Sequence, residues 1–188
     1  MLMPKIINEE KVFKAVLKLL TKRGYDRTTT SDMAAAANIH EATLFRKYGS
    51  KVGLIEQAIE QQLSTTPLKQ VRYSGDLRAD LIAILEAYLI TVEEHGEIMP
   101  MLLLEIPRHP ELKNTLQIPL ANIQGIMQIL ERYQNEGLLK EESALVRFNV
   151  FLAPIMVTKM YRRIQTDSLA IAIDVQDYVD AFLQGRKR

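Results

Sequence analysis

The side chains best suited to chemistry in this 188-residue chain are a hydroxyl and two cations in its first third. Thr43, Arg46 and Lys47 have the spacing of one face of a short helix that is predicted to begin near residue 41. Leu44 and Tyr48 lie four residues apart on the opposite face, where they are expected to pack inward. A helix face with exposed cations and hydroxyls can contact base edges in a major groove, so this pattern favours DNA binding.

Another short helix is predicted just before this one. Thr29 and Asp32 have the spacing of a capping box, ahead of a methionine and a run of alanines. The run ends at Asn38, and asparagine is the residue after glycine that best tolerates a left-handed backbone. Two short helices joined by a tight turn are typical of a helix-turn-helix. The alternative interpretation is a packed helical hairpin with a solvated cationic face.

At these residues the chain resembles the TetR family of bacterial repressors. The resemblance covers about the first quarter to third of the chain and rests on an ordered set of motifs: Gly24-Tyr25, Thr28-Thr29, Met33-Ala34, Ala37-Asn38-Ile39-His40, Ala42-Thr43-Leu44-Phe45, Tyr48 and Ser50-Lys51. The chain departs from the family pattern where Asn38 replaces the turn glycine, His40 the N-cap serine and Ala42 a glycine. Phe45 lacks the phenol that the family often has there, which removes one phosphate contact.

The motifs and their charges together predict two groups of DNA contacts. Lys51 follows the predicted N-cap Ser50, so its ammonium and the helix N-terminus can attract the same phosphate. Phosphate contacts are expected from Thr28, Thr29, Tyr48 and Lys51. Base edges are expected to be read by His40, Glu41, Thr43, Arg46 and Lys47.

Composition is compatible with this interpretation without requiring it. Hydrophobic residues make up 47% of the chain and cysteine is absent, which fits a full core in a reducing cytoplasm. Residues 1–64 hold 10 Lys and Arg against 7 Asp and Glu, whereas the remainder is slightly acidic. No apolar run is expected to span a membrane, and the first eleven residues are too polar for a signal peptide. We therefore expect a cytoplasmic protein without membrane association.

Helical spacing recurs along the chain and strand patterns are nearly absent, so the predicted fold is all-α. An N-terminal three-helix head with the helix-turn-helix, residues 1–50, is expected to join a larger helical body for ligand binding and dimerisation, residues 51–188. The linking helix is predicted at about 51–63. Asn8, Ser50, Asp76 and Asp174 are predicted N-caps. The remaining helices are predicted at about 9–23, 76–95, 97–106, 119–136, 143–164 and from 174 to near the C-terminus, with a short turn at 111–116.

Signatures of catalysis are missing from the sequence. It has no glycine-rich phosphate loop, no HExxH motif and no serine in a nucleophile elbow. The three histidines lie far apart, without the spacing of metal ligands. We expect no enzyme activity, no cofactor and no metal site.

The resemblance implies that the body binds a small effector between its middle helices. Apolar side chains on the inward faces of these helices are the candidates, although most of them must simply form the core. The expected effector is lipophilic with little charge. Its predicted lining residues are Tyr88, Met99, Leu103, Ile123, Met127, Phe151 and Met156.

Dimerisation is expected because a single helix-turn-helix contacts only a half-site. The predicted helix over 143–164 is apolar on almost every side, which suggests that a partner subunit covers part of it. The last helix adds an apolar stripe, and the two helices would form a four-helix bundle with their copies around a two-fold axis. The predicted interface residues are Val175, Tyr178, Val179, Phe182 and Leu183. The alternative is that both helices close the core of a monomer.

Together these patterns predict a sequence-specific regulator that binds palindromic double-stranded DNA as a homodimer, acting as a repressor released by a small apolar effector. A helical small-molecule-binding or interaction dimer that has lost DNA binding is the alternative.

Overall fold

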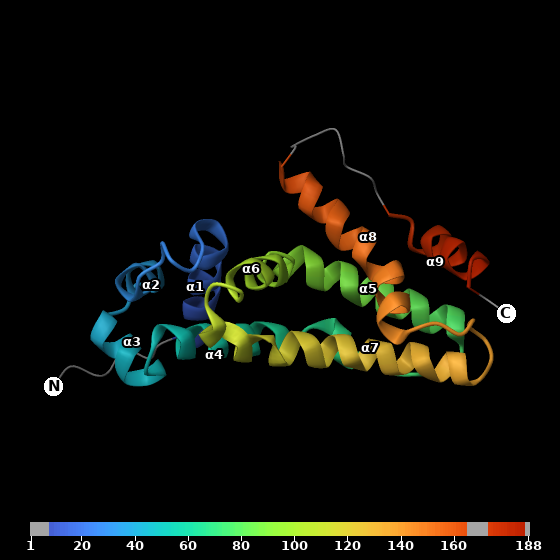
Figure 1. Ribbon diagram of the computed structural model, residues 1–188. Coiled ribbons are helices and arrows are strands. Elements are labelled where there is room, and N and C mark those ends of the chain that lie inside the picture. The colour runs from blue at the N-terminus through green and yellow to red at the C-terminus, as the bar shows by residue number, and fades with distance from the viewer. Residues whose placement is uncertain (1–7, 165–172, 187–188) are drawn as a thin grey trace. The chain divides into compact units, whose positions relative to one another are not determined.

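The computed structural model describes residues 8–164 and 173–186, and these contain helices and no β-strand (Figure 1). The predicted all-α fold is therefore confirmed. The expectation about a signal peptide falls largely on residues 1–7, outside the described residues. The chain forms two compact units. The head unit comprises residues up to Thr65 together with Glu97–Pro119, and the body unit comprises Thr66–Gly96 together with the chain from Leu120 onward.

The head unit is built around one apolar core that α1 and α4 share with the helix-turn-helix. Asn8 accepts a hydrogen bond from the Lys11 N–H and so caps α1, as predicted. Ser50 caps α4 in the same way by accepting from the Gly53 N–H. Its elements are α1 (Glu9–Arg23), α2 (Thr30–Ala37), α3 (Glu41–Tyr48), α4 (Lys51–Ser64), α6 (Ile98–Glu105) and the 3₁₀ helix η2 (Pro110–Leu116).

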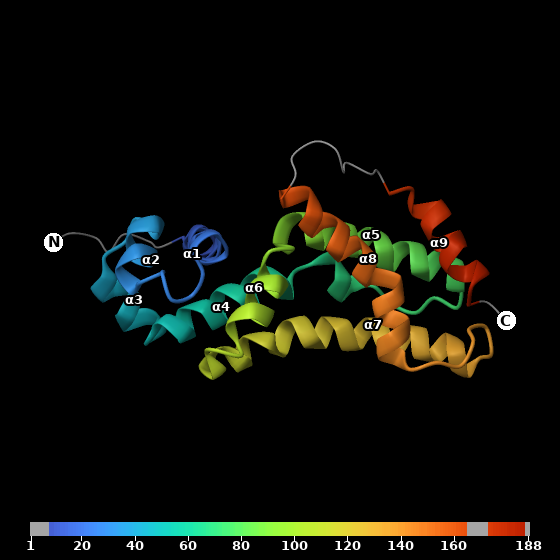
Figure 2. The ribbon, with the colours of Figure 1, turned by 45° about the horizontal axis from the view of Figure 1, so that its top comes forward.

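The body unit has a separate core, in which α8 and α9 both pack against α5 (Figure 2). Asp76 and Asp174 cap α5 and α9 as predicted. The segment after α4 contains a short 3₁₀ helix. The elements are η1 (Pro67–Gln70), α5 (Leu77–His95), most of α7 (Gln117–Asn135), α8 (Ala144–Ile164) and α9 (Val175–Gln184).

The apolar stripe of α9 is buried inside its own chain. Val179 is fully buried, and Phe182 and Leu183 are 6% and 8% exposed. Tyr178 donates its hydroxyl to the Phe151 carbonyl oxygen at 2.6 Å, and the rings of Phe151 and Phe182 lie 4.6 Å apart. The prediction that these residues and Val175 form the dimer interface is therefore wrong for Val179, Phe182 and Leu183. The periodic stripe identified a buried face correctly, but α5 and α8 of the same chain cover it.

The exposed apolar face of the body unit belongs to α8 instead. Val146, Val150, Val157 and Met160 are 39–48% exposed and have the spacing of a single helix face. Helix α8 also has a buried polar residue that the sequence interpretation missed, because Arg147 is fully buried beside Gln134 and Glu142.

By length and composition alone, α8 is apolar enough to cross a membrane. Its window Ala144–Tyr161 has a mean hydropathy of 1.2, and only 28% of that window is buried. The window includes Arg147 and Lys159 and is not a membrane span, so it does not contradict the expectation that no apolar run spans a membrane. A helix also has this composition when one of its faces packs on the core of its own chain and the opposite face packs on another protein.

Candidate DNA-binding surface

The turn between α2 and α3 is set by local hydrogen bonds. Thr29 accepts from the Asp32 N–H at 3.1 Å, and Asp32 accepts from the Thr29 N–H at 2.9 Å, which completes the predicted capping box. Asn38 has the predicted left-handed backbone, with φ 54° and ψ 46°. Its N–H and that of Ile39 donate to carbonyl oxygens in the last turn of α2, so α2 stops abruptly and α3 starts in a new direction.

One face of α3 is anchored in the core of the head unit. Leu44 is 1% exposed and Tyr48 is 6% exposed. The Tyr48 ring meets the Phe13 ring edge-on, with centroids 5.6 Å apart. Because this face is buried, the rest of α3 faces outward.

The outward side of α3 has the residues predicted to read base edges. His40, Arg46 and Lys47 are exposed, while Glu41 and Thr43 are half-buried. Glu41 accepts a hydrogen bond from the Thr30 hydroxyl at 2.6 Å, and Lys47 pairs with a carboxylate of α1. These contacts orient two of the five side chains, and the readout by all five remains a prediction.

Two of the predicted phosphate contacts are wrong because the side chains are buried. Thr28 is fully buried and donates its hydroxyl to the Gly24 carbonyl oxygen at 2.8 Å. The phenolic oxygen of Tyr48 is likewise shielded from solvent. Thr29 is exposed, but its hydroxyl donates to Asp32 within the cap. The spacing of these residues in the motif could not separate a structural hydroxyl from an exposed one.

Lys51, the fourth predicted phosphate contact, faces the loop after α1. Its ammonium donates to the Tyr25 carbonyl oxygen at 2.6 Å and lies 3.6 Å from the centroid of the Tyr25 ring. Burial lowers the pKa of the Lys51 ammonium, against the opposing effect of Asp26, Glu105 and Glu111. The ammonium has three N–H donors, and the Tyr25 carbonyl oxygen accepts from one of them. A phosphate contact of Lys51 through another donor remains a prediction.

The sequence interpretation missed two apolar groups on α3. Phe45 is 45% exposed, and Ala42 is exposed beside it on the outward side. Apolar side chains on a reading helix can contact the methyl group of thymine. The helical spacing of these residues with Arg46 was the signal that could have placed them there.

Known proteins resemble this chain both in sequence and in fold. The HTH-type transcriptional regulator YvkB of Bacillus subtilis, itself uncharacterized, is 28% identical over 147 residues, 78% of each chain. IcaR of Staphylococcus aureus, a negative transcriptional regulator of a biofilm operon, is 26% identical over 71% of this chain and 66% of its own. The fold is similar to that of PfmR from Thermus thermophilus, with a TM-score of 0.68 and 19% identity over 93% and 97% of the two chains. Residues 12–58 match the family described as bacterial regulatory proteins, tetR family. The helix-turn-helix of this chain is of the TetR family.

With this TetR-family segment the chain is a helix-turn-helix transcriptional regulator. The matched residues begin within α1 and end within α4, and so include the whole helix-turn-helix. The predicted boundary after residue 50 divides the chain by role, whereas the compact head unit of the structure also includes α4, α6 and η2.

The predicted effector residues are divided between the two units. Met99 and Leu103 belong to the head unit, and Leu103 is 55% exposed. Phe151 is fully buried in the core of the body unit. Tyr88 is largely buried, which raises the pKa of its phenol to about 12. Ile123, Met127 and Met156 are half-buried on α7 and α8.

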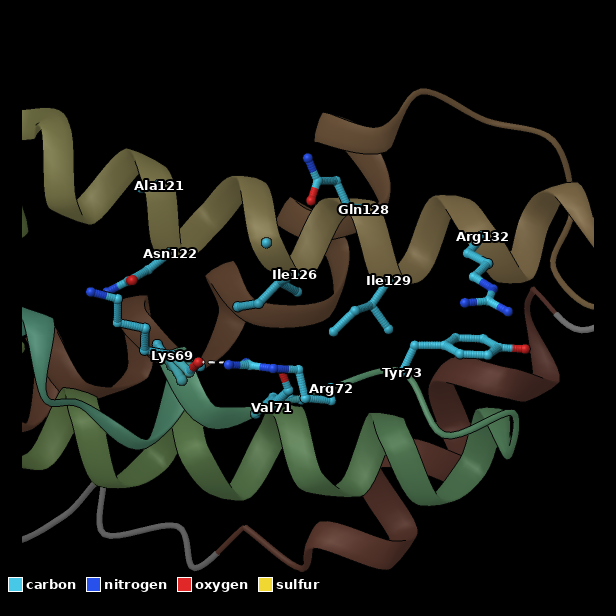
Figure 3. A pocket seen from close by; sticks show the side chains of 12 residues that line it. Lys69, Val71, Arg72, Tyr73, Ala121, Asn122, Ile126, Gln128, Ile129 and Arg132 are labelled. Carbon is cyan, nitrogen blue, oxygen red and sulfur yellow. Dashed lines mark hydrogen bonds between the residues drawn. The ribbon is translucent and has the colours of Figure 1, made fainter.

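A groove of about 390 Å³ lies in the body unit, between one side of α7 and η1 with the segment that follows it (Figure 3). None of the seven predicted residues lines it. Ile126 and Ile129 reach into it from α7, and Arg132 lies with its guanidinium 3.6 Å from the centroid of the Tyr73 ring. It is lined by Leu68, Lys69, Val71, Arg72, Tyr73, Ala121, Asn122, Gly125, Ile126, Gln128, Ile129 and Arg132.

Proposed function

We propose that this TetR-family protein is a repressor that binds an inverted-repeat operator as a homodimer and releases it when a small effector binds. The observation that carries the DNA-binding part is the outward face of α3. Its cations and half-buried polar groups are presented by a helix whose other face is fixed in the core. Repression fits IcaR, a relative that is a negative regulator.

The proposed dimer uses the exposed apolar face of α8. Val146, Val150, Val157 and Met160 form a stripe long enough to pack against the same stripe of a second copy. A two-fold axis would relate the two heads of the dimer by the same symmetry that relates the two halves of an inverted repeat.

The proposed effector binds in the groove between η1 and α7. Its volume lies within the usual range for small-molecule sites. The apolar part of its wall is formed by Leu68, Val71, Ile126 and Ile129. Lys69, Arg72 and Arg132 lie along it, and a cationic rim favours a negatively charged group on the ligand. We therefore revise the predicted uncharged effector to an amphipathic acid.

Selection of duplexes from a random pool tests DNA binding by the purified protein. We expect enrichment of an inverted repeat whose half-sites are about one helical turn or more apart, centre to centre. A pool that yields no enriched sequence at moderate salt would instead favour the helical dimer without DNA binding.

The effector proposal is tested with decanoate and, as its uncharged control, decanol. Decanoate should raise the melting temperature and lower affinity for the selected duplex more than decanol does, because only the acid pairs with the rim. Lys69→Glu should reduce the decanoate effect and leave the decanol effect unchanged. Equal responses to both compounds in wild type and variant would contradict an anionic ligand in this groove.

A further inference from the structure

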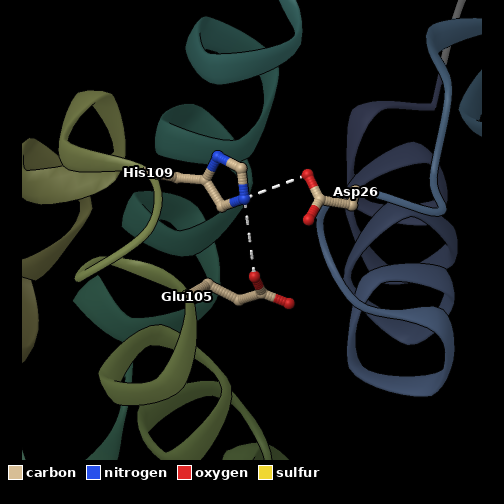
Figure 4. A group of neighbouring side chains, drawn as sticks. All are labelled: Asp26, Glu105 and His109. Carbon is tan, nitrogen blue, oxygen red and sulfur yellow. Dashed lines mark ion pairs between the residues drawn. The ribbon is translucent and has the colours of Figure 1, made fainter.

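Three metal-ligating side chains from distant parts of the sequence converge in the head unit. His109 Nε2 lies 3.0 Å from Asp26 Oδ1 and 3.8 Å from Glu105 Oε2 (Figure 4). One ligand atom from each residue lies within 4.8 Å of the other two. Asp26 lies in the loop between α1 and α2, whereas Glu105 and His109 are four residues apart at the end of α6 and just beyond it.

The Glu105 carboxylate is held in place by the loop that it faces. Its Oε1 accepts a hydrogen bond from the Tyr25 N–H at 3.0 Å, which leaves Oε2 directed toward His109. Gly24 makes this approach feasible, because a Cβ atom at that position would lie 2.9 Å from Glu105 Oε1 and the backbone φ is +81°. Such a backbone hydrogen bond is typical of the support that orients a ligating carboxylate.

The His109 imidazole is oriented from its other side. Its Nδ1 lies 3.5 Å from Glu111 Oε1, and its ring lies against the Tyr25 ring with centroids 4.5 Å apart. An Nδ1–H directed at Glu111 leaves the Nε2 lone pair facing Asp26 and Glu105, an arrangement that resembles the carboxylate–histidine–metal triad. Nε2 is buried and makes no hydrogen bond to any described residue. A lone pair between two carboxylates is repelled by both unless a proton or a metal ion lies among them, and a metal ion can be shared by all three groups.

The charges around this cluster also favour a cation. Asp26, Glu105 and Glu111 bring three negative charges, and all three act on the Lys51 ammonium, which adds one positive charge. With a neutral imidazole, these four charged side chains leave an excess of two negative charges. A divalent ion would neutralise that excess.

We propose that Asp26, Glu105 and His109 form a binding site for a divalent first-row transition-metal ion. One imidazole and two carboxylates suit Zn²⁺ or Co²⁺, with water completing the coordination. Bonds of about 2.0–2.2 Å to a tetrahedral ion place ligand atoms roughly 3.3 Å apart, between the two separations measured from His109 Nε2. The bound ion joins the loop before α2 to the end of α6. This assigns a role to the Glu-x-x-x-His spacing at the end of α6, which the sequence interpretation did not recognise as a ligand pair.

Titration of the full-length protein with Co²⁺ alone, in the absence of DNA, tests the site. We expect one equivalent of Co²⁺ to bind with visible ligand-field absorption and to be displaced by Zn²⁺. His109→Gln and Asp26→Asn should each abolish this signal, and Asp26→Asn changes an exposed side chain that the core does not need. Glu111→Gln, which alters only the group behind the imidazole, should weaken binding about 10–100-fold. His95→Gln is the matched histidine control and should bind Co²⁺ like the wild type.

A thermal measurement keeps the test valid if a variant is unstable. Zn²⁺ should raise the melting temperature of the wild type and of His95→Gln, because the ion binds the folded head. It should not raise that of Asp26→Asn. Absence of Co²⁺ binding by the wild type at millimolar ion, or unchanged binding by both Asp26→Asn and His109→Gln, would overturn the proposal.

Discussion

At the scale of single residues, the body unit depends on a buried carboxylate with a full set of donors. Asp80 is 4% exposed and accepts hydrogen bonds from the Ser74 N–H, the Ser74 hydroxyl and the phenol of Tyr133. Tyr133 is fully buried, and its pKa is raised by burial and by this hydrogen bond to Asp80. The contacts join the segment before α5 to α7.

Removal of the phenol should therefore destabilise the body unit. We expect Tyr133→Phe to lower the free energy of unfolding by about 1–3 kcal/mol, because Asp80 loses a donor while it stays buried. Tyr161→Phe is the control, since Tyr161 is 57% exposed and should change stability by less than about 0.5 kcal/mol. Denaturant unfolding measures both. Equal stability of Tyr133→Phe and the wild type would show that this hydrogen bond contributes nothing net.

Residue types along the sequence predicted the chemistry of α3 better than they predicted which side chains point outward. Arg46 is exposed as expected, whereas Thr28 and Tyr48, polar residues in the same motif, are buried. Threonine and tyrosine have one polar atom on a largely apolar side chain, so a core can take in most of that side chain. The Thr28 hydroxyl is satisfied by the Gly24 carbonyl, which only the folded loop provides. The Tyr48 hydroxyl has no hydrogen-bond partner among the described residues.

At the scale of elements, the start of α4 needs a glycine. The sequence offers no reason for Gly53 in the first turn of a helix, where glycine costs about 1 kcal/mol relative to alanine. In the structure, a Cβ atom at Gly53 would lie 2.5 Å from the Tyr48 carbonyl oxygen. The close approach of α3 and α4 explains the residue.

Two alanine substitutions at helical glycines should therefore change stability in opposite directions. Gly53→Ala should destabilise the head unit by about 1–3 kcal/mol, because backbone must move to admit the methyl group. Gly125→Ala should stabilise α7 by up to about 1 kcal/mol, because no atom lies within 4 Å of its added Cβ. Thermal unfolding compares the two proteins. A Gly53→Ala protein at least as stable as the wild type would contradict the steric explanation.

Helix boundaries were predictable because their signals are local. Asn8, the Thr29–Asp32 capping box, Ser50, Asp76 and Asp174 all make the cap hydrogen bonds expected of them. By contrast, the surface that covers an apolar stripe is set by tertiary contacts and cannot be predicted from neighbouring residues in the sequence. The stripe of α9 is covered by its own chain and the stripe of α8 is not, although both have helical periodicity.

At the scale of the whole molecule, the exposed stripe of α8 predicts the assembly. Val150 and Val157 are 39% and 42% exposed, and the double substitution Val150→Glu with Val157→Glu should convert a dimer into a folded monomer. Ile90→Glu is the control, because Ile90 is 48% exposed on α5 outside the stripe. Sedimentation should show dimers for wild type and control and monomers for the double variant. A monomeric wild type at micromolar concentration would rule out the proposed interface.

Contacts between distant segments were beyond the reach of sequence patterns. Asp26 meets Glu105 and His109 only because α6 and η2 fold against the helices of the head unit. No local spacing connects residues about eighty positions apart, whereas the spacing from Glu105 to His109 was visible. The sequence could therefore suggest half of this cluster and none of its geometry.

DNA recognition by this protein is proposed to depend on α3, which reads base pairs in a major groove. This proposal is tested by selecting duplexes from a random pool with three proteins in parallel. They are the wild type, Arg46→Ala and Arg108→Ala. Arg108 is an exposed arginine of the head unit that lies outside α3. We expect Arg46→Ala to lose its preference at one base pair in each half of the inverted repeat, at a cost of about 1–3 kcal/mol, and Arg108→Ala to keep the wild-type preferences. Identical base preferences in all three proteins would contradict this proposal.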